Sequence, residues 1–386
     1  MIQTLGIANY RSIHDLRVRL GSLNVVTGPN GSGKSNFYRA LRLLANCAQG
    51  RVTQALAREG GLKSTLWAGP EVQTRAQKAG TERAQGTVRQ TPLRLKLGFA
   101  GDTFGYAVSL GIPVPAATVF NLDPEIKRES IFAGAHYRAA SALVDRQGPV
   151  LKVRDGRSWR VIEKHLPGYD SLFARLVDPD QSPEAWQLRD EIRCWRFYDH
   201  FRSDSDAPAR QAQLGTRTPV LDADGRDLAA ALQTILELGD PGEMHDAVED
   251  AFPGSQVSVA VDESNRFEVR LQQPGLLRPL HASELSDGTL RYLLWIAALL
   301  TPRPPPLMVL NEPETSLHPD LLPALGRLII RASSRSQIWV ISHAQRLVNV
   351  LERDEACSSI HLEKVSGATT VLGQGPLERP NWHWAD

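Results

Sequence analysis

The stretch that decides the fold lies near the N-terminus, where residues 25–36 read VVTGPNGSGKSN. An apolar strand runs into a glycine-rich loop of the form G-x-x-x-x-G-K-S, and a helix is expected to begin near Lys34. In such a loop the backbone N–H groups converge on phosphates, the lysine reaches the β and γ oxygens, and the serine hydroxyl binds Mg²⁺. The positive end of the helix dipole favours the same anion. The motif predicts a nucleotide-phosphate site formed by Gly28, Pro29, Asn30, Gly31, Ser32, Gly33, Lys34, Ser35 and Asn36, with Lys34 catalytic and Ser35 a metal ligand.

Length and composition limit what the molecule can be. A chain of 386 residues with 42% hydrophobic residues can form one large or two ordinary domains with a real core. Lysine plus arginine number 44 and aspartate plus glutamate 43, so any nucleic-acid contact requires a local basic patch. The sequence has no apolar run long enough to span a membrane, no leader, and three cysteines without a C-x-x-C pair. We therefore expect a cytoplasmic protein with no membrane partner.

The order of apolar runs and breaks predicts three parts. An N-terminal lobe covers residues 1–133 and includes a polar stretch at 69–91 that we interpret as a loop. Residues 134–215 mix short strands with one helix and are interpreted as an inserted lid. Residues 216–386 form a C-terminal lobe, and its last hundred residues alternate helix and strand, which indicates parallel α/β architecture. The elements expected around the glycine loop are strands over residues 2–7, 16–20 and 23–27 and a helix over 34–47.

The second half of the chain carries three further elements in a fixed order. A signature segment, residues 285–289 (LSDGT), opens an apolar helix, and Ser286 is a good cap for it. An acidic strand end, residues 311–314 (NEPE), follows a buried strand, and another apolar strand ends about thirty residues later in Ser342-His343. Each element alone is more often structural, as a helix cap, a strand end or a structural histidine. Their order after a phosphate loop favours a joint function.

This order of pieces resembles the ATP-binding-cassette heads of the RecF and SMC families, over roughly residues 1–50 and 280–350. The segment NEPETSLHP, residues 311–319, is similar to predicted AAA-type ATPases related to RecF and to the OLD (overcoming lysogenization defect) group. The resemblance implies an α/β P-loop NTPase fold of the ABC-ATPase type with an antiparallel β subdomain and an inserted lid. Only 43 residues follow His343, so we expect no OLD-type nuclease domain.

The resemblance also assigns roles to individual residues. The phosphate loop would hold ATP and Mg²⁺, Glu312 would polarise the attacking water, and His343 would be the switch histidine near the γ-phosphate. Ser286 and Gly288 would contact the ATP of a second subunit, so that ATP joins a homodimer. The metal ligands would be Ser35, Asn311 and Glu312. The implied function is ATP hydrolysis linked to dimerisation, in DNA repair or anti-phage defence through DNA contact.

One departure from the family pattern supports an alternative. Asn311 stands where such heads usually have an aspartate, and an amide oxygen without charge binds Mg²⁺ less strongly than a carboxylate, unless Glu312 or Glu314 compensates. Slow turnover would suit a nucleotide-gated scaffold that regulates a separate effector protein. The glutamine that senses Mg²⁺ in such heads is not determined by the sequence, because four candidates are equivalent: Gln73, Gln77, Gln85 and Gln90.

Basic residues gather at three places that could contact DNA phosphates, although a solvated basic surface explains each equally well. The three basic clusters are Arg75, Lys78, Arg83, Arg89, Arg94 and Lys96; Lys127 and Arg128; and Arg154, Arg157, Arg160 and Lys164.

The C-terminal Trp382-His383-Trp384 is interpreted either as a docking tail or as a disordered end.

Overall fold

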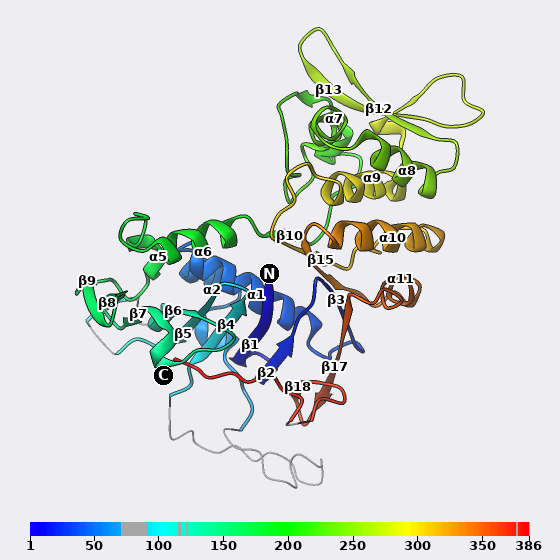
Figure 1. Cartoon of the computed structure of the whole chain (residues 1–386). Helices are drawn as coiled ribbons and strands as arrows, with labels where there is room; N and C mark the ends of the chain where they lie inside the picture. The colour runs from blue at the N-terminus through cyan, green and yellow to red at the C-terminus, as the bar shows by residue number, and fades with distance from the viewer. Residues whose placement is uncertain (71–91, 115–116, 121, 376, 386) are drawn as a thin grey trace. The chain divides into compact units, whose positions relative to one another are not determined.

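The computed structural model describes residues 1–70, 92–114, 117–120, 122–375 and 377–385 (Figure 1). The chain divides into two compact units. The first unit comprises Met1–Gly21, Val26–Trp195 and Ile360–Asp386, and the second comprises Ser22–Val25 and Arg196–Ser359. Most of the polar stretch predicted at 69–91 lies outside the described residues. Within the described ranges, no helix combines the length and apolar character needed to cross a bilayer.

The first unit is built on an eight-stranded antiparallel sheet of order β2-β1-β4-β5-β6-β7-β8-β9, which confirms the antiparallel β subdomain. In β1 nearly every residue is buried, rather than every second one, because both faces of the sheet are covered there. The strands are β1 (Ile2–Tyr10), β2 (Ile13–Arg19), β4 (Leu95–Gly101), β5 (Phe104–Gly111), β6 (Glu125–Ala133), β7 (Ala142–Gln147), β8 (Val150–Asp155) and β9 (Ser158–Glu163).

Helix α1 (Lys34–Ala48) packs against β1 and β4 (Figure 1). Its buried residues Phe37, Leu41 and Leu44 recur at the three- and four-residue spacing of one helix face. The helix ends where Gly50 takes a left-handed φ of 71° and donates its N–H to the Cys47 carbonyl. The helix predicted over residues 34–47 is therefore confirmed. The other α-helices among the described residues of this unit are α2 (Val52–Arg58), α3 (Leu62–Thr65), α5 (Leu172–Arg175) and α6 (Pro183–Arg193).

The C-terminal tail, red in Figure 1, packs onto the same antiparallel sheet. The Trp382 side chain lies over Gly6 of β1 and Gly98 of β4, where an added Cβ would come within 2.9 and 2.7 Å of its indole. Trp382 is 2% exposed and contacts Phe132 edge-on. Glycine at both positions makes the space that the indole fills, so the tail is ordered and docked rather than a disordered end.

The second unit has a parallel core that fits the α/β architecture predicted for this region. Strand β15 (Leu307–Asn311) lies between β10 (Arg196–Tyr198) and β16 (Gln337–Ile341), in parallel with both, and the first residues of β3 (Leu23–Thr27) follow β16. The final strands β17 (Cys357–Val365) and β18 (Ala368–Val371) form an antiparallel hairpin whose paired residues, 362–365 and 368–371, belong to the first unit. A second, antiparallel sheet contains β11 (Gln213–Leu214), β12 (Gln256–Val261), β13 (Arg266–Gln272) and β14 (Leu280–His281).

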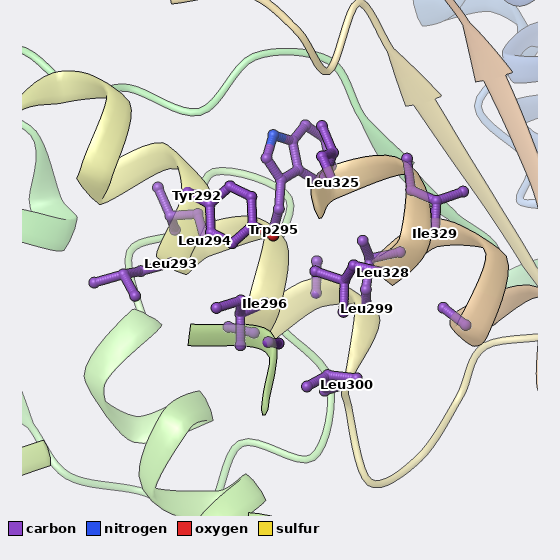
Figure 2. Packing of buried hydrophobic residues seen from close by; sticks show 14 of the residues in the cluster. Tyr292, Leu293, Leu294, Trp295, Ile296, Leu299, Leu300, Leu325, Leu328 and Ile329 are labelled. Atoms are coloured by element: carbon purple, nitrogen blue, oxygen red, sulfur yellow. The ribbon is translucent and has the colours of Figure 1, made fainter. Parts of the chain in front are cut away.

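Helices α9 and α10 form the hydrophobic core of the second unit. Figure 2 shows Trp295 and Leu299 of α9 beside Leu325, Leu328 and Ile329 of α10. Helix α9 is buried almost all round, because α7, α8 and α10 all pack against it. The helices of this unit are α7 (Leu228–Leu238), α8 (Pro241–Ala251), α9 (Asp287–Leu299), α10 (Leu322–Ser333) and α11 (Gln345–Leu351).

The segment interpreted as a lid is divided between the units. Residues 134–195 carry β7, β8, β9, α5 and α6 and cluster with the first unit, whereas β10 and the residues after it cluster with the second. Strands β7 to β9 extend the antiparallel sheet without a break in strand order. The lid role and the lobe boundaries at 133 and 215 stay predictions.

Candidate functional site

The phosphate loop, residues 28–35, has a backbone conformation that favours glycine at three positions. Gly28, Gly31 and Gly33 have φ values of 144°, 80° and 108°. A Cβ on Gly28 would lie 2.2 Å from the Leu362 carbonyl oxygen, and one on Gly33 would lie 2.1 Å from Thr369 Oγ1. The β17–β18 hairpin thus supports the loop so closely that two of the glycines have no room for a side chain.

A small network of hydroxyl groups fixes the loop and the start of α1. Thr369 Oγ1 donates to the Ser32 carbonyl at 2.8 Å and lies 2.7 Å from Ser12 Oγ. The Asn36 amide donates to the same Ser12 hydroxyl at 2.8 Å. Asn36, predicted to bind the cofactor, is therefore engaged in positioning the helix. Ser12 and Thr369 carry no motif, so sequence reasoning missed them.

The polar groups of the loop fit a phosphate. Lys34 is 9% exposed, and its Nζ donates to the carbonyl oxygens of Gly28 at 2.6 Å and Pro29 at 3.2 Å. The Ser32 hydroxyl is buried and has no hydrogen-bond partner among the described residues. Ser35 and Asn30 are exposed at the loop surface. A buried ammonium, an unpartnered hydroxyl and a glycine-lined backbone are the groups that a triphosphate with Mg²⁺ requires.

The signature segment lies at the start of α9 in the second unit. Ser286 caps the helix as predicted, since its Oγ accepts the Thr289 N–H at 3.1 Å. Ser286 is exposed, and a Cβ on Gly288 would lie 3.2 Å from the Ser316 carbonyl oxygen. The signature segment therefore adjoins the loop that follows the acidic strand end.

A buried arginine that the sequence did not single out holds the signature segment. Arg210 is 9% exposed, and its guanidinium donates to the carbonyl oxygens of Ala282 at 3.0 Å and Leu285 at 2.7 Å. It also pairs with Asp287 at 2.7 Å. The fork of N–H donors matches several acceptors at once, so one side chain fixes the turn that leads into α9.

Arg291, on α9, links the signature helix to the loop after the acidic strand end. Its Nη1 donates to the Thr315 carbonyl at 2.9 Å, its Nε to Ser203 Oγ at 3.0 Å, and its Nη2 contacts His200 Nε2 at 3.0 Å. Burial and the nearby Arg291 charge both lower the pKa of His200. A neutral imidazole can accept the Arg291 hydrogen bond, whereas an imidazolium could not.

The acidic strand end and His343 follow neighbouring parallel strands. Asn311 of β15 pairs in register with Ile341 of β16, and the Glu312 N–H donates to the Ile341 carbonyl at 2.8 Å. Glu312 is exposed and has a φ of 49°, in the left-handed region that favours glycine. His343 follows β16, and its side chain is 59% exposed. Glu314, expected from the sequence only as a residue that could compensate for Asn311 at Mg²⁺, is buried beside His343.

Part of the predicted set lies together within the second unit. Within the second unit, Ser286 and Gly288 adjoin the loop after the strand end, and Glu312 and His343 extend from adjacent strands. Residues 28–36 belong to the first unit. The four candidate sensor glutamines, Gln73, Gln77, Gln85 and Gln90, lie outside the described residues.

The basic clusters differ in how their charges are compensated. Lys127 pairs with Glu125, and Arg128 pairs with Asp145. On the β8–β9 hairpin, by contrast, an edge basic patch of four residues forms no ion pair within the described part of the chain. In the first cluster Arg94 and Lys96 are described, whereas Arg75, Lys78, Arg83 and Arg89 are not. The edge basic patch consists of Arg154, Arg157, Arg160 and Lys164.

Comparisons with known proteins agree with this architecture. A crystal structure titled as the SmcHead bound to the C-winged helix domain of ScpA matches with a TM-score of 0.52 and 12% identity, covering 98% of this chain and 99% of that one. An SMC head domain from Thermotoga maritima matches with a TM-score of 0.50 and 13% identity, covering 97% and 99%. At these identities the likeness shows the fold alone, a P-loop NTPase fold of the SMC-head type. A search of curated proteins found no match.

A family model matches residues 23–349, well over half of the chain, and includes the phosphate loop, the signature segment and both strand ends. The chain therefore belongs to the family described as "AAA domain, putative AbiEii toxin, Type IV TA system".

Proposed function

We propose that this protein binds ATP with Mg²⁺ at the phosphate loop and hydrolyses it. The observation that carries the proposal is the glycine-lined loop. In it the Lys34 ammonium donates to two backbone carbonyls, and the Ser32 hydroxyl is buried without a hydrogen-bond partner among the described residues. Such a loop binds phosphate oxygens through its N–H groups, and its lysine stabilises their charge. Family membership supports the same activity.

The proposed roles follow the resemblance, residue by residue. Lys34 holds the β and γ phosphate oxygens, and Glu312 accepts a proton from the attacking water. Ser35, Asn311 and Glu312 would hold Mg²⁺, which when bound supplies positive charge to the phosphate oxygens. His343 acts near the γ-phosphate.

We further propose that ATP joins two copies of the chain. Ser286 and Gly288 would contact the nucleotide of the partner through the N-terminus of α9, where an anion is stabilised by the free N–H groups and the helix dipole. Ser286 is exposed at that N-terminus, which is compatible with a contact to a second subunit. A two-fold arrangement would place the same surface of both copies in the interface.

We propose DNA repair or anti-phage defence as the biological role, exerted through DNA contact. The family's description as a toxin of a toxin–antitoxin system favours defence. The edge basic patch is the best described candidate for the DNA contact, because its charges form no ion pairs within the described residues. Replacing Arg157, Arg160 and Lys164 by glutamine should weaken DNA binding and its salt dependence, whereas Lys127→Gln should change neither.

Steady-state ATP turnover with Mg²⁺, with and without double-stranded DNA, tests the main proposal. The variant Lys34→Ala provides the background rate. Turnover above that background supports an ATPase, and stimulation by DNA supports the DNA role. Turnover equal to the background in both conditions contradicts ATP hydrolysis by the isolated protein.

A nucleotide-gated scaffold with little hydrolysis is the second candidate, favoured by Asn311 in place of an aspartate. Asn311 is half-buried at the end of β15, where its amide offers an uncharged ligand to Mg²⁺. The variant Asn311→Asp separates the candidates. A rise in turnover of about tenfold would indicate that the amide limits hydrolysis, and co-purification of an effector protein in a fixed ratio would support the scaffold.

A further inference from the structure

The Glu314 carboxylate is buried beneath the switch loop, residues 342–344. Its side chain is 6% exposed, and its Oε1 accepts hydrogen bonds from Ser342 Oγ at 2.8 Å, His343 N at 2.9 Å and Ala344 N at 3.2 Å. Ser342 also accepts from the Ala344 N–H at 3.0 Å. Three consecutive residues are thus fixed to one carboxylate oxygen that belongs to the neighbouring strand end.

Removing this carboxylate would leave the loop without its acceptor. A buried carboxylate is unfavourable unless hydrogen bonds replace its water, and here the donors to Oε1 come from a single short loop. Glu314 Oε2 is buried without a hydrogen-bond partner among the described residues. The hydrogen bonding of this carboxylate is therefore concentrated on the switch loop.

The imidazole of His343 also faces the same oxygen. Its Nδ1 lies 3.2 Å from Glu314 Oε1, whereas most of the ring is exposed. The contact is an ion-pair distance and not one of the hydrogen bonds of the carboxylate, but a lone pair on Nδ1 would face its negative charge, so the contact favours a proton on Nδ1. A neutral ring with Nδ1 protonated has a free lone pair on Nε2. The carboxylate thus favours the form of His343 in which Nε2 is available to a ligand, as carboxylates do for histidines in other sites.

Glu312, the residue proposed to polarise the attacking water, belongs to the same strand end as Glu314. Glu312 and Glu314 flank Pro313, whose carbonyl accepts the Trp295 Nε1–H at 3.1 Å. The Glu312 N–H donates to the Ile341 carbonyl, one residue before the switch loop. The acidic strand end therefore donates a hydrogen bond to the end of β16 through the Glu312 N–H. It accepts a hydrogen bond from the His343 N–H, just after β16, through Glu314 Oε1.

We propose that Glu314 is a positioning residue that fixes the switch loop and holds His343 in the tautomer with Nδ1 protonated and Nε2 free. Its catalytic consequence rests on the proposed ATPase function, but the tautomer does not. The residue acts through His343 and Glu312 and needs no contact with the nucleotide.

Nitrogen-15 NMR of histidine-labelled protein without nucleotide tests the tautomer directly. The chain has ten histidines, and the variant His343→Asn identifies the resonances that belong to His343. At a pH where the ring is neutral, we expect the wild-type ring to be protonated at Nδ1. A ring protonated mainly at Nε2, which is the form preferred by a free imidazole, would overturn the proposal without any variant of Glu314.

The variant Glu314→Gln then removes the charge but keeps an acceptor oxygen for the loop. We expect the tautomer to shift toward Nε2–H. The matched control is Glu352→Gln, because Glu352 also accepts from a serine hydroxyl, at 2.7 Å from Ser359, but is exposed. An unchanged His343 tautomer in a folded Glu314→Gln protein would contradict the role of the charge.

Turnover separates this inference from the proposed function. If the protein is an ATPase, Glu314→Gln should lower kcat about tenfold with KM changed less than about threefold. The double variant Glu314→Gln/His343→Asn should hydrolyse ATP no more slowly than the slower of the two single variants, because Glu314 acts through His343. If Glu314→Gln shifts the His343 tautomer but the wild-type protein shows no ATP turnover, the positioning role is supported and the ATPase proposal is rejected. Additive losses would overturn action through His343.

Discussion

The phosphate loop and the acidic strand end are two kinds of site in one chain. The loop is a single run of eight residues whose shape depends on three glycines and on the hairpin behind it. The strand end and the signature segment are held by Arg210, Arg291 and Glu314, whose contacts join residues 77, 24 and 29 positions apart. A contiguous site can be recognised by its motif, whereas an assembled site is recognisable only through the buried polar contacts that hold it.

This difference leads to a functional contrast between the two units. If the phosphate loop alone holds the nucleotide, changes in the first unit should reduce both binding and turnover. If the strand end and the signature segment act only on nucleotide already bound, changes in the second unit should spare binding.

The largest effect is expected for Lys34→Ala. Turnover should fall about 100- to 1000-fold, because a buried ammonium that stabilises developing phosphate charge is lost. ATP affinity should fall as well. Steady-state turnover and equilibrium binding measure the two, with Lys63→Ala as the control, since Lys63 is an exposed lysine on α3 of the same unit. Unchanged affinity would mean that the loop is not the main binding site.

A loss of about 100-fold in turnover is expected for Glu312→Gln, as for removal of a general base. ATP should still bind, and a nucleotide-bound dimer should accumulate because hydrolysis no longer separates it. Size-exclusion chromatography with light scattering would detect the dimer, and the exposed Glu355→Gln provides the control. A monomer in saturating ATP would contradict the dimerisation proposal. Loss of ATP binding would contradict the expectation that changes in the second unit spare binding.

In both sites the sequence could predict the local elements but not the distant contacts that hold them. The phosphate loop, α1 and the Ser286 cap were predicted because each depends on neighbours within a few residues. The contact of Thr369 with Ser32 joins residues 337 positions apart, and that of Arg210 with Leu285 joins residues 75 apart. No spacing of threonine or arginine residues along a sequence predicts such distant partners. The fold class was predictable from the order of motifs, but the distant groups that hold either site were not.

A smaller loss, about 10- to 100-fold in turnover, is expected for Ser286→Arg, because it would remove one contact to the partner's nucleotide. ATP binding by the monomer should be unchanged, since Ser286 belongs to the second unit. The dimer that Glu312→Gln accumulates should disappear when Ser286→Arg is added. Ser264→Arg, in the exposed turn between β12 and β13, tests whether any added arginine has this effect. Normal turnover in Ser286→Arg would rule out a two-subunit site.

The smallest effect is expected in stability and compares two glycines of the phosphate loop. Gly31→Ala and Gly33→Ala both place a side chain at a positive φ, 80° and 108°, which costs about 1 to 2 kcal/mol in each. Only at Gly33 would the new Cβ also overlap another group, Thr369 Oγ1, whereas nothing lies within 4 Å at Gly31. Gly33→Ala should therefore lower the free energy of unfolding by about 1 to 2 kcal/mol more than Gly31→Ala. Urea unfolding measures both, and the second change Thr369→Ala should reduce the gap because it removes the overlapping hydroxyl. Equal losses in the two glycine variants would mean that the loop's shape is a local property of its own sequence, and that the β17–β18 hairpin is not needed to hold it.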